Sequence, residues 1–278
     1  MKKFLAVLLL IILVTSCEFG EKKPAVKLEE SPEAIPKFVN YKVESINKQS
    51  GPCQTDSLSN QCASFFVEYP IITGMLSPAA TQKINESIKS AIFDYAFVSD
   101  KPESFQSLIE EISSEYSKIL NEFPDYKASW SMEVNSDIIY QDSSYISVAS
   151  TIFSYTGGAH PNAYQVYRSY DLQTGEPITL SDILIPGFED QLNEMAEIEF
   201  RMLKEIPPSQ ALKVKGYFFE GDKFTLNDNF AIINKSLIFY FNQFEIAPYA
   251  VGPTELELKL TDYVNLVDAK GILNGLKN

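Results

Sequence analysis

WSMEVNSDIIYQDSSYISVASTIFSYTGGAHPNAYQVYRSYDL, residues 130–172, contains three runs in which apolar and polar residues alternate. The apolar positions of these runs are Trp130, Met132 and Val134; Ile146, Val148 and Ile152; and Tyr164, Val166, Tyr170 and Leu172. A period of two residues is typical of strands that bury one face. Gly157 and Gly158 predict a turn between the second and third runs, because paired glycines accept tight turns. The segment therefore predicts three consecutive antiparallel strands.

The residues before this segment predict a hairpin and two helices. Residues 38–49 and 63–72 carry strand-forming residues on either side of a polar loop, which indicates a hairpin. Ser77 and Pro78 predict the start of the first helix, with serine as N-cap and proline at the first helical position. We expect the second helix to start near Pro102. Its apolar positions follow helical spacing: Phe105, Leu108, Ile109, Ile112, Tyr116, Ile119, Leu120 and Phe123.

The residues after this segment again mix helical and strand patterns. We expect a turn, a short strand and a helix entry within Thr174–Leu184, then a helix over Gly187–Ile206 that is ended by two prolines. Further strands are expected at 230–234, 237–241 and 254–260, followed by a short helix near the end. No regular βαβ alternation is present, so we predict an α+β fold with a largely antiparallel sheet and helices packed on it. We divide it into two consecutive modules that share one compact unit, residues 38–170 and 171–278.

The first 17 residues predict export and a lipid anchor. Two lysines precede an apolar run over Phe4–Val14, and Thr15-Ser16-Cys17 follows, as in a signal peptide. The run is too short to span a bilayer, which needs about 20 apolar residues. VTSC resembles the lipobox of bacterial lipoproteins, so residues 1–16 are interpreted as the signal and Cys17 as the lipidated residue. The alternative is an ordinary cleaved signal, or an inner-membrane stub, with an accidental cysteine.

The residues after the anchor predict where the folded part lies. Residues 17–37 comprise the lipidated cysteine and a charged, proline-containing stretch that we interpret as a flexible tether. We therefore expect an extracytoplasmic, membrane-anchored protein. Glu18 stands where aspartate commonly marks inner-membrane retention, which favours the outer membrane in a double-membrane bacterium.

The acidity of the chain limits its partners. The signal removes two of the 23 basic residues and none of the 37 acidic ones, so the net charge changes from −14 to −16. This charge argues against nucleic acid and against an anionic membrane surface as partners. It suits a cationic partner, although acidity also serves solubility alone.

The two remaining cysteines predict a disulfide. Cys53 and Cys62 lie nine residues apart in GPCQTDSLSNQCASF, a polar loop of an exported chain. A bond between them is the expected outcome in an oxidising compartment. Two thiols and one distant histidine do not complete a set of zinc ligands, so we expect no metal site.

The sequence contains no clear catalytic constellation. His160 is the only histidine, and any Ser-His or Cys-His mechanism would have to use it. Ser154 and Ser169 are near it in sequence, but no G-x-S-x-G pattern surrounds them. Acidic pairs such as Glu110 with Glu111, or Glu194 with Glu197, lie in predicted helices, where a solvated face explains them. We therefore expect no enzyme and no cofactor.

Two groups of segments resemble a known family. The first group is Phe153–His160, Tyr170–Gly175 and Ile178–Asp182; the second is Leu237–Phe241 and Phe244–Gly252. Together they are similar to the extracytoplasmic domains of RsiV-like proteins, which are lysozyme-sensing anti-sigma factors. The same module precedes the catalytic domain of certain peptidoglycan deacetylases. The resemblance covers most of residues 38–266, and it implies a two-part α+β module that binds lysozyme in the sensor branch.

The resemblance implies recognition, but neither signalling nor deacetylation. We expect this sequence to have neither a cytoplasmic segment that would hold a sigma factor, nor a transmembrane helix, nor a metal-binding catalytic domain. The residues of interest either contact a ligand or shape turns: Gly157, Gly158, His160, Asn162 and Tyr249. The leading hypothesis is a binding lipoprotein of the cell envelope, with lysozyme or peptidoglycan fragments as partner. The alternatives are a cell-wall glycan enzyme that uses paired carboxylates, and an envelope scaffold.

Overall fold

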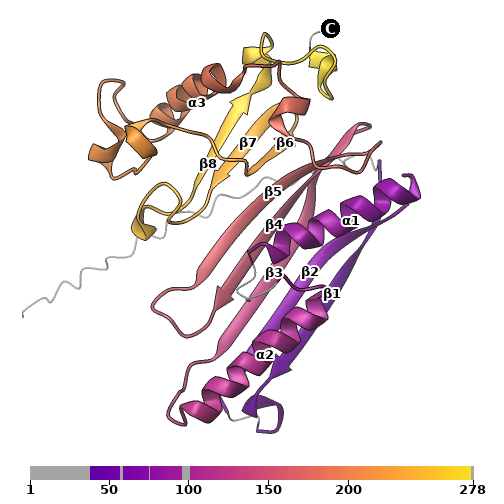
Figure 1. Cartoon of the computed structure of the whole chain (residues 1–278), viewed down its shortest axis with the longest axis vertical. Coiled ribbons are helices and arrows are strands. Elements are labelled where there is room, and N and C mark those ends of the chain that lie inside the picture. Colours follow the sequence, from indigo (N-terminus) through magenta and orange to yellow (C-terminus); the bar gives the residue numbers. More distant parts are fainter. Residues whose placement is uncertain (1–37, 57–58, 75, 96–100, 277–278) are drawn as a thin grey trace, which may run out of the picture. The chain divides into compact units, whose positions relative to one another are not determined.

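The structure, a computed structural model, describes residues 38–276 apart from 57–58, 75 and 96–100. Residues 35–278 form one compact unit, and its described part has the predicted α+β fold, with a five-stranded and a three-stranded sheet (Figure 1). The strands are β1 (Asn40–Ser50), β2 (Ala63–Gly74), β3 (Trp130–Gln141), β4 (Tyr145–Tyr155), β5 (Asn162–Asp171), β6 (Phe230–Ile233), β7 (Ser236–Phe241) and β8 (Thr254–Lys259). The α-helices are α1 (Pro78–Phe93), α2 (Phe105–Glu122) and α3 (Glu189–Leu203). Cys17 and the tether lie outside the described residues.

The five-stranded sheet has the order β1-β2-β3-β4-β5. The predicted hairpin of β1 and β2 and the three consecutive antiparallel strands β3, β4 and β5 are confirmed. The pair β2 and β3 is parallel, with Ala63 opposite Trp130 and Val67 opposite Val134. A parallel pair needs a long crossover between its strands. Helices α1 and α2 provide that crossover, which makes this largely antiparallel sheet a mixed one.

Helices α1 and α2 cover one face of this sheet (Figure 1). Ser77 caps α1 as predicted, because its side chain accepts a hydrogen bond from the backbone N–H of Ala80 at 3.1 Å. Helix α2 starts at Phe105, later than expected, since Ser104 is its N-cap and accepts from the N–H of Ser107. The contacts of both helices with the sheet form one apolar core, which includes Phe65, Val67, Ile84, Ile88, Leu108, Tyr116, Val134, Ile146 and Val166.

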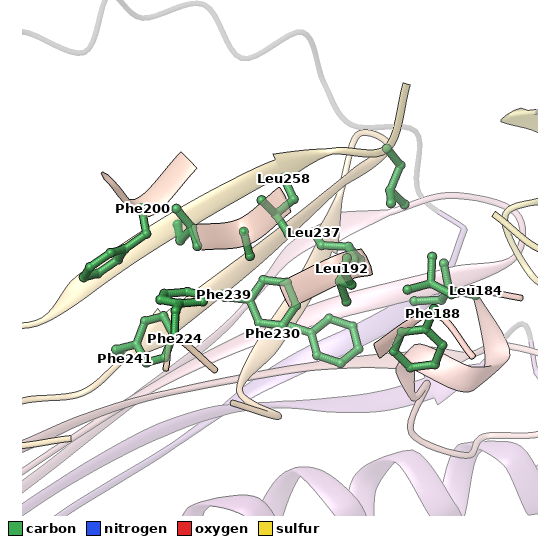
Figure 2. Packing of buried hydrophobic residues seen from close by; sticks show 14 of the residues in the cluster. Leu184, Phe188, Leu192, Phe200, Phe224, Phe230, Leu237, Phe239, Phe241 and Leu258 are labelled. Atoms are coloured by element: carbon green, nitrogen blue, oxygen red, sulfur yellow. The ribbon is translucent and has the colours of Figure 1, made fainter. Parts of the chain in front are cut away.

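The three-stranded sheet is antiparallel, in the order β6-β7-β8, and packs with α3 around a second core. Phe200 of α3 is fully buried at the centre of an aromatic group, with its ring centroid 5.1 Å from that of Phe224 and 4.9 Å from that of Tyr217. Figure 2 shows this core, in which Phe200, Phe224 and Phe241 lie together at one end and Phe188 and Leu184 at the other.

Small side chains join the two sheets. Ser147 of β4 and Ser169 of β5 are opposite each other and fully or almost fully buried, with their hydroxyl oxygens 2.7 Å apart. Ser147 donates to the carbonyl of Ile232 in β6 at 2.6 Å, and the N–H of Ile232 donates to Ser169 at 2.9 Å. Serines leave room for the backbone of β6 to approach, and they satisfy its polar groups where water is excluded. The second sheet is therefore fixed on the face of β4 and β5 opposite the helices.

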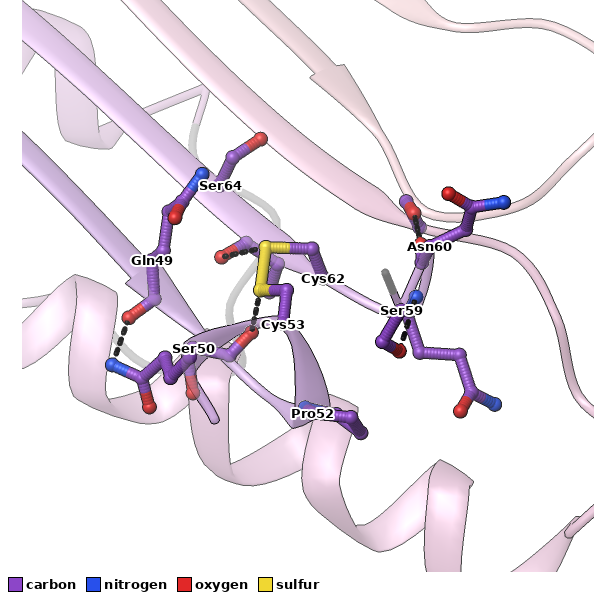
Figure 3. The surroundings of a disulfide bond; sticks show 12 residues. Gln49, Ser50, Pro52, Cys53, Ser59, Asn60, Cys62 and Ser64 are labelled. Atoms are coloured by element: carbon purple, nitrogen blue, oxygen red, sulfur yellow. Dashed lines mark hydrogen bonds between the residues drawn. A yellow bond between two sulfur atoms is a disulfide. The ribbon is translucent and has the colours of Figure 1, made fainter. Parts of the chain in front are cut away.

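The predicted disulfide is confirmed. Cys53 and Cys62 are bonded, with their Cα atoms 5.3 Å apart, and they close the loop between β1 and β2 (Figure 3). The backbone N–H of Cys53 also donates to the carbonyl of Gln61 at 3.2 Å. Disulfides persist in oxidising compartments, so this bond indicates an extracytoplasmic location.

Replacing both cysteines, Cys53→Ser with Cys62→Ser, is expected to lower the free energy of unfolding by about 2–3 kcal/mol or less. So short a loop removes little entropy from the unfolded chain, which limits the loss. Urea unfolding of the double variant and of the unreduced parent would measure it. Labelling of both thiols in the native, unreduced parent would contradict the bond itself.

Candidate functional site

The Gly-Gly-Ala-His sequence forms the exposed turn between β4 and β5. Gly157 has a φ of +88°, which other residues rarely adopt, and a Cβ on it would lie 2.2 Å from the Tyr126 hydroxyl. That hydroxyl donates to the carbonyl of Thr156 at 3.1 Å and accepts from the indole N–H of Trp130 at 2.8 Å. Gly157 therefore has a structural role in the turn. Gly158 has no such requirement, since the nearest atom to its Cβ position lies 3.8 Å away.

His160 of this turn stacks on Tyr249, which lies about ninety positions later in the chain. Their ring centroids are 4.5 Å apart and their planes are inclined by 22°. Phe244 contacts the same tyrosine, with centroids 5.3 Å apart, and its side chain is 60% exposed. We call His160, Phe244 and Tyr249 the aromatic stack. It brings together the two sequence strings that carry the family resemblance, Gly157–His160 and Glu245–Gly252.

Hydrogen bonds fix the aromatic stack on the edge of β5. Asn242 accepts from the N–H of Gln165 at 2.7 Å and donates to the carbonyl of the same residue at 3.1 Å. Glu245 accepts from the backbone N–H of Asn242 at 2.7 Å and from the side-chain amide of Asn227 at 2.6 Å. Phe244 lies between these two anchors with a positive φ of 65°. Its exposed ring is therefore presented by a held backbone, and not by a free loop.

Asn162, the remaining predicted residue, is the first residue of β5 and pairs with Ser154 of β4. It is half-buried, and the structure gives it a place in the sheet next to the turn. Phe244 was part of the quoted resemblance but was not selected as a site residue. Phe244 is recognised as a site residue only through its ring contact with Tyr249, and no spacing in the sequence indicates that contact.

Two tyrosines near Glu245 were not among the predicted site residues. Tyr95, after the end of α1, packs on Tyr164 of β5 with ring centroids 4.9 Å apart. Burial raises the pKa of Tyr95, the positive charge of Arg168 opposes that rise, and the negative charge of Glu245 adds to it. Tyr95 is therefore a neutral phenol at physiological pH, so its ring adds aromatic surface and no negative charge of its own.

The sheet face opposite α1 and α2 is acidic where the second sheet does not cover it. β3 exposes Glu133, Asn135 and Asp137 in alternation with its buried residues. Glu133 is opposite Phe153 of β4, which is half-buried. Strand β4, which pairs with β3 along this face, leads into the turn that carries His160, so the carboxylates of β3 lie beside the strand that ends at the aromatic turn.

Ser169 and His160 have separate contacts in the structure. Ser169 is almost fully buried and its hydroxyl is engaged by Ser147 and Ile232, whereas His160 is exposed and its ring faces Tyr249. No cluster of three histidine, cysteine or acidic side chains that could hold a metal ion occurs among residues 38–276 outside the gaps. Glu197 of the predicted acidic pairs forms an ion pair with Arg201 at 2.7 Å on α3. None of the helices in the described part of the chain combines the length and the hydrophobicity of a membrane-spanning segment.

Two protein families match successive parts of the chain. Residues 57–163 match the family described as deacetylase PdaC, and residues 181–261 match DUF3298, a family of proteins of unknown function. The N-terminal part of the folded chain is therefore similar to the PdaC family, and the part that follows is similar to DUF3298. His160 lies in the first match and Tyr249 in the second, so the aromatic stack joins the two families' segments.

Relatives with a name or a solved structure extend this comparison. Esterase Rv3036c of Mycobacterium tuberculosis is 34% identical over 119 residues, 40% of this chain and 48% of the esterase. The chain thus aligns with about half the length of that relative. A DUF3298 family protein of Bacteroides fragilis has the same fold, with a TM-score of 0.69, 17% identity, and coverage of 86% of this chain and 97% of that chain. One from Pseudomonas aeruginosa has a TM-score of 0.63 and 15% identity, and covers 84% and 95%.

Proposed function

We propose that this chain is a lipoprotein of the cell envelope, anchored through Cys17, whose folded part binds a protein such as lysozyme or a peptidoglycan-related ligand without catalysis. The observation that carries the proposal is the exposed aromatic stack, which unites the two parts of the family resemblance. The PdaC and DUF3298 matches and the extracytoplasmic disulfide support it.

The aromatic stack has the physical properties of a binding site. Exposed aromatic rings held on a fixed backbone lose little conformational entropy when a partner covers them. Such rings contribute most of the binding energy in many interfaces. Phe244 and His160 are exposed and in contact with Tyr249, so a partner can bury adjoining ring surfaces at once.

The charge of the chain favours a cationic partner. With 37 acidic residues in the whole chain, and carboxylates such as Glu133 and Asp137 on the open sheet face, long-range attraction would speed the encounter with a basic protein. Screening lowers that attraction as salt rises. We therefore expect the association rate to fall with salt, with a smaller change in the dissociation rate.

Phe244→Ala is expected to weaken lysozyme binding about 10- to 30-fold, because truncation of a central interface aromatic typically costs about 2 kcal/mol. Surface-immobilised kinetics with residues 24–278, at low and near-physiological salt, would measure this. Phe123→Ala is the matched control, since Phe123 at the end of α2 is 59% exposed and Phe244 is 60% exposed. An unrelated cationic protein of similar size is the control for the partner. Equal loss in both variants, or equal binding of both partners, would contradict a specific lysozyme site and direct the test to peptidoglycan fragments.

Replacing the anchor residue, Cys17→Ser, is expected to move nearly all of the protein from the membrane fraction to the non-membrane fraction. A single hydrophobic signal of this length cannot hold the chain stably, whereas the acyl chains of a lipoprotein can. Fractionation of cells that express the full chain, with blotting of both fractions, would show it. Continued membrane association of the variant would contradict the anchor.

A second candidate function, ester hydrolysis, is favoured by the similarity to Esterase Rv3036c. Against it, the ring of His160 stacks on Tyr249, and the nearby Ser169 is buried and engaged in the contact between the sheets. An assay of the parent and of His160→Ala on a chromogenic ester separates the candidates. Hydrolysis that is lost in His160→Ala would favour the esterase, and background rates in both would favour the binding protein.

An envelope scaffold would instead be indicated by stable co-purification with other envelope proteins.

A further inference from the structure

The outer edge of β1 is a long strand edge that no other described strand covers. β1 is the terminal strand of the five-stranded sheet, and its 11 residues pair with β2 without irregularity after Tyr41. Most of its residues are exposed, including Val43 at 54% and Tyr41 at 39%. An uncovered edge presents a row of backbone N–H and C=O groups that can pair with another strand. Strands are typically about 5–6 residues long, so this edge is unusually extended.

We propose that two copies of this chain associate through β1, antiparallel and about a two-fold axis at Ile46, so that their five-stranded sheets become one continuous sheet. The proposal is independent of the aromatic stack, which lies at the other end of the sheet, on β5. It rests on the charges of β1 and on the registers that symmetry allows.

Symmetry restricts the registers of this pairing to those centred on one residue. In an antiparallel pair, opposite residues lie on the same face, and a two-fold axis between identical strands places one residue opposite its own copy. The charged residues of β1 are Lys42, Glu44 and Lys48. Like charges directly opposite one another destabilise a pair of strands, and unlike charges stabilise it.

Among the axes that place unlike charges opposite each other, the axis at Ile46 gives the longest overlap of the two strands. Glu44 of each copy then lies opposite Lys48 of the other, which forms two opposite-charge pairs around the centre. An axis at Ser45 would place Lys42 opposite Lys48, and axes at Glu44 or Lys48 would place each of these opposite its own copy. An axis at Val43 also pairs Lys42 with Glu44, but it leaves the second half of β1 unpaired.

The contacts within one copy fit this register. Lys42 lies 3.7 Å from Glu44 on the same strand, so Glu44 would stand between a lysine of its own copy and one of the second copy. Ile46 is half-buried against the core under α1 and α2, and its copy would cover the remaining surface. At the end of β1 the side-chain amide of Gln54 donates to the carbonyl of Gln49 at 2.7 Å, so we expect the pairing to be firmest between Lys42 and Lys48.

Single cysteines along β1 of the full-length chain test the register in cells. Ile46→Cys should form an intermolecular disulfide on oxidation, because opposite Cα atoms in antiparallel strands are about 4.5–5.5 Å apart, within disulfide range. Val43→Cys and Lys48→Cys are the controls, since their copies would be roughly 20 Å and 13 Å apart at about 3.3 Å per residue. We expect at least five times more cross-linked dimer at position 46 than at either control.

Charge reversal in the Ile46→Cys background tests the proposed pairs. Glu44→Lys should reduce the cross-linked dimer at least fivefold, and Glu44→Lys combined with Lys48→Glu should restore it to within twofold of the parent. A maximum at position 43, equal or absent cross-linking at all positions, or failure of the double reversal to restore it would overturn the proposal. So would a main adduct of another mass at position 46, because it would identify a different protein as the occupant of this edge.

Discussion

Asn229→Leu is expected to lower the free energy of unfolding by about 2–4 kcal/mol, since it removes the side chain that links the second sheet to β5. Asn229 is almost fully buried and accepts from the backbone N–H of Tyr167 at 2.7 Å. It also donates to the carbonyls of Gln165 and Tyr240, at 2.8 and 2.9 Å. Leucine has a similar size but neither donor nor acceptor, so the loss is one of hydrogen bonding.

Most of the expected loss in stability comes from one backbone group. The carbonyl of Gln165 keeps a bond from Asn242, and the carbonyl of Tyr240 keeps one from Asn227, whereas the buried N–H of Tyr167 loses Asn229, its acceptor among the described residues. A buried, unpaired donor costs about 1–3 kcal/mol, and the lost bonds add to it.

Urea unfolding measures the difference, provided that the slope with urea is unchanged. Asn135→Leu, on the exposed face of β3, is the matched control and should change stability by no more than about 0.5 kcal/mol. Equal midpoints for Asn229→Leu and the parent would mean that the asparagine does not hold the sheets together.

The sequence predicts where the strands of this fold lie along the chain, but it does not predict which strands are adjacent in the sheet. The alternation around Val134 and Val148 fixes which side chains are buried, because a period of two places them on one face. It contains no information on which strand lies beside β2, and that position is decided by the α1–α2 crossover. The disulfide was predictable for a different reason, since Cys53 and Cys62 are close in sequence and no other pairing competes within the folded part.

The candidate site was predictable only in pieces. His160 and Tyr249 could be selected separately from the two resembling strings, but their contact depends on how the second sheet docks on β5. That docking uses single polar side chains such as Asn242 and Ser169, which have no periodicity in the sequence. In place of the expected short strand within Thr174–Leu184, the structure has two isolated bridges, Tyr170 with Pro177 and Leu184 with Val267, and a short 3-10 helix.

Gly175→Ala is expected to lower the free energy of unfolding by about 2–5 kcal/mol, through two effects that can be separated. Gly175 follows β5 in a turn that Asp171 closes by accepting from the N–H groups of Gln173 and Thr174, both at 2.7 Å. Its φ is +77°, so any side chain strains the backbone by about 1–2 kcal/mol. In addition, a Cβ would lie 2.6 Å from the carbonyl oxygen of Ala80 and 2.7 Å from its Cα, in the first turn of α1.

The second effect cannot be relieved by a side-chain rotation, because the obstacle is the backbone of Ala80, which is buried. Overpacking of this kind costs about 1–3 kcal/mol. Gly187→Ala isolates the first effect, since Gly187 has nearly the same φ, +80°, with open space around its Cβ position. Chemical unfolding of both variants should therefore show a greater loss for Gly175→Ala, by about the overpacking cost. Equal losses would mean that α1 yields to the new methyl group, and that the turn between the two modules packs on the helix less tightly than these distances require.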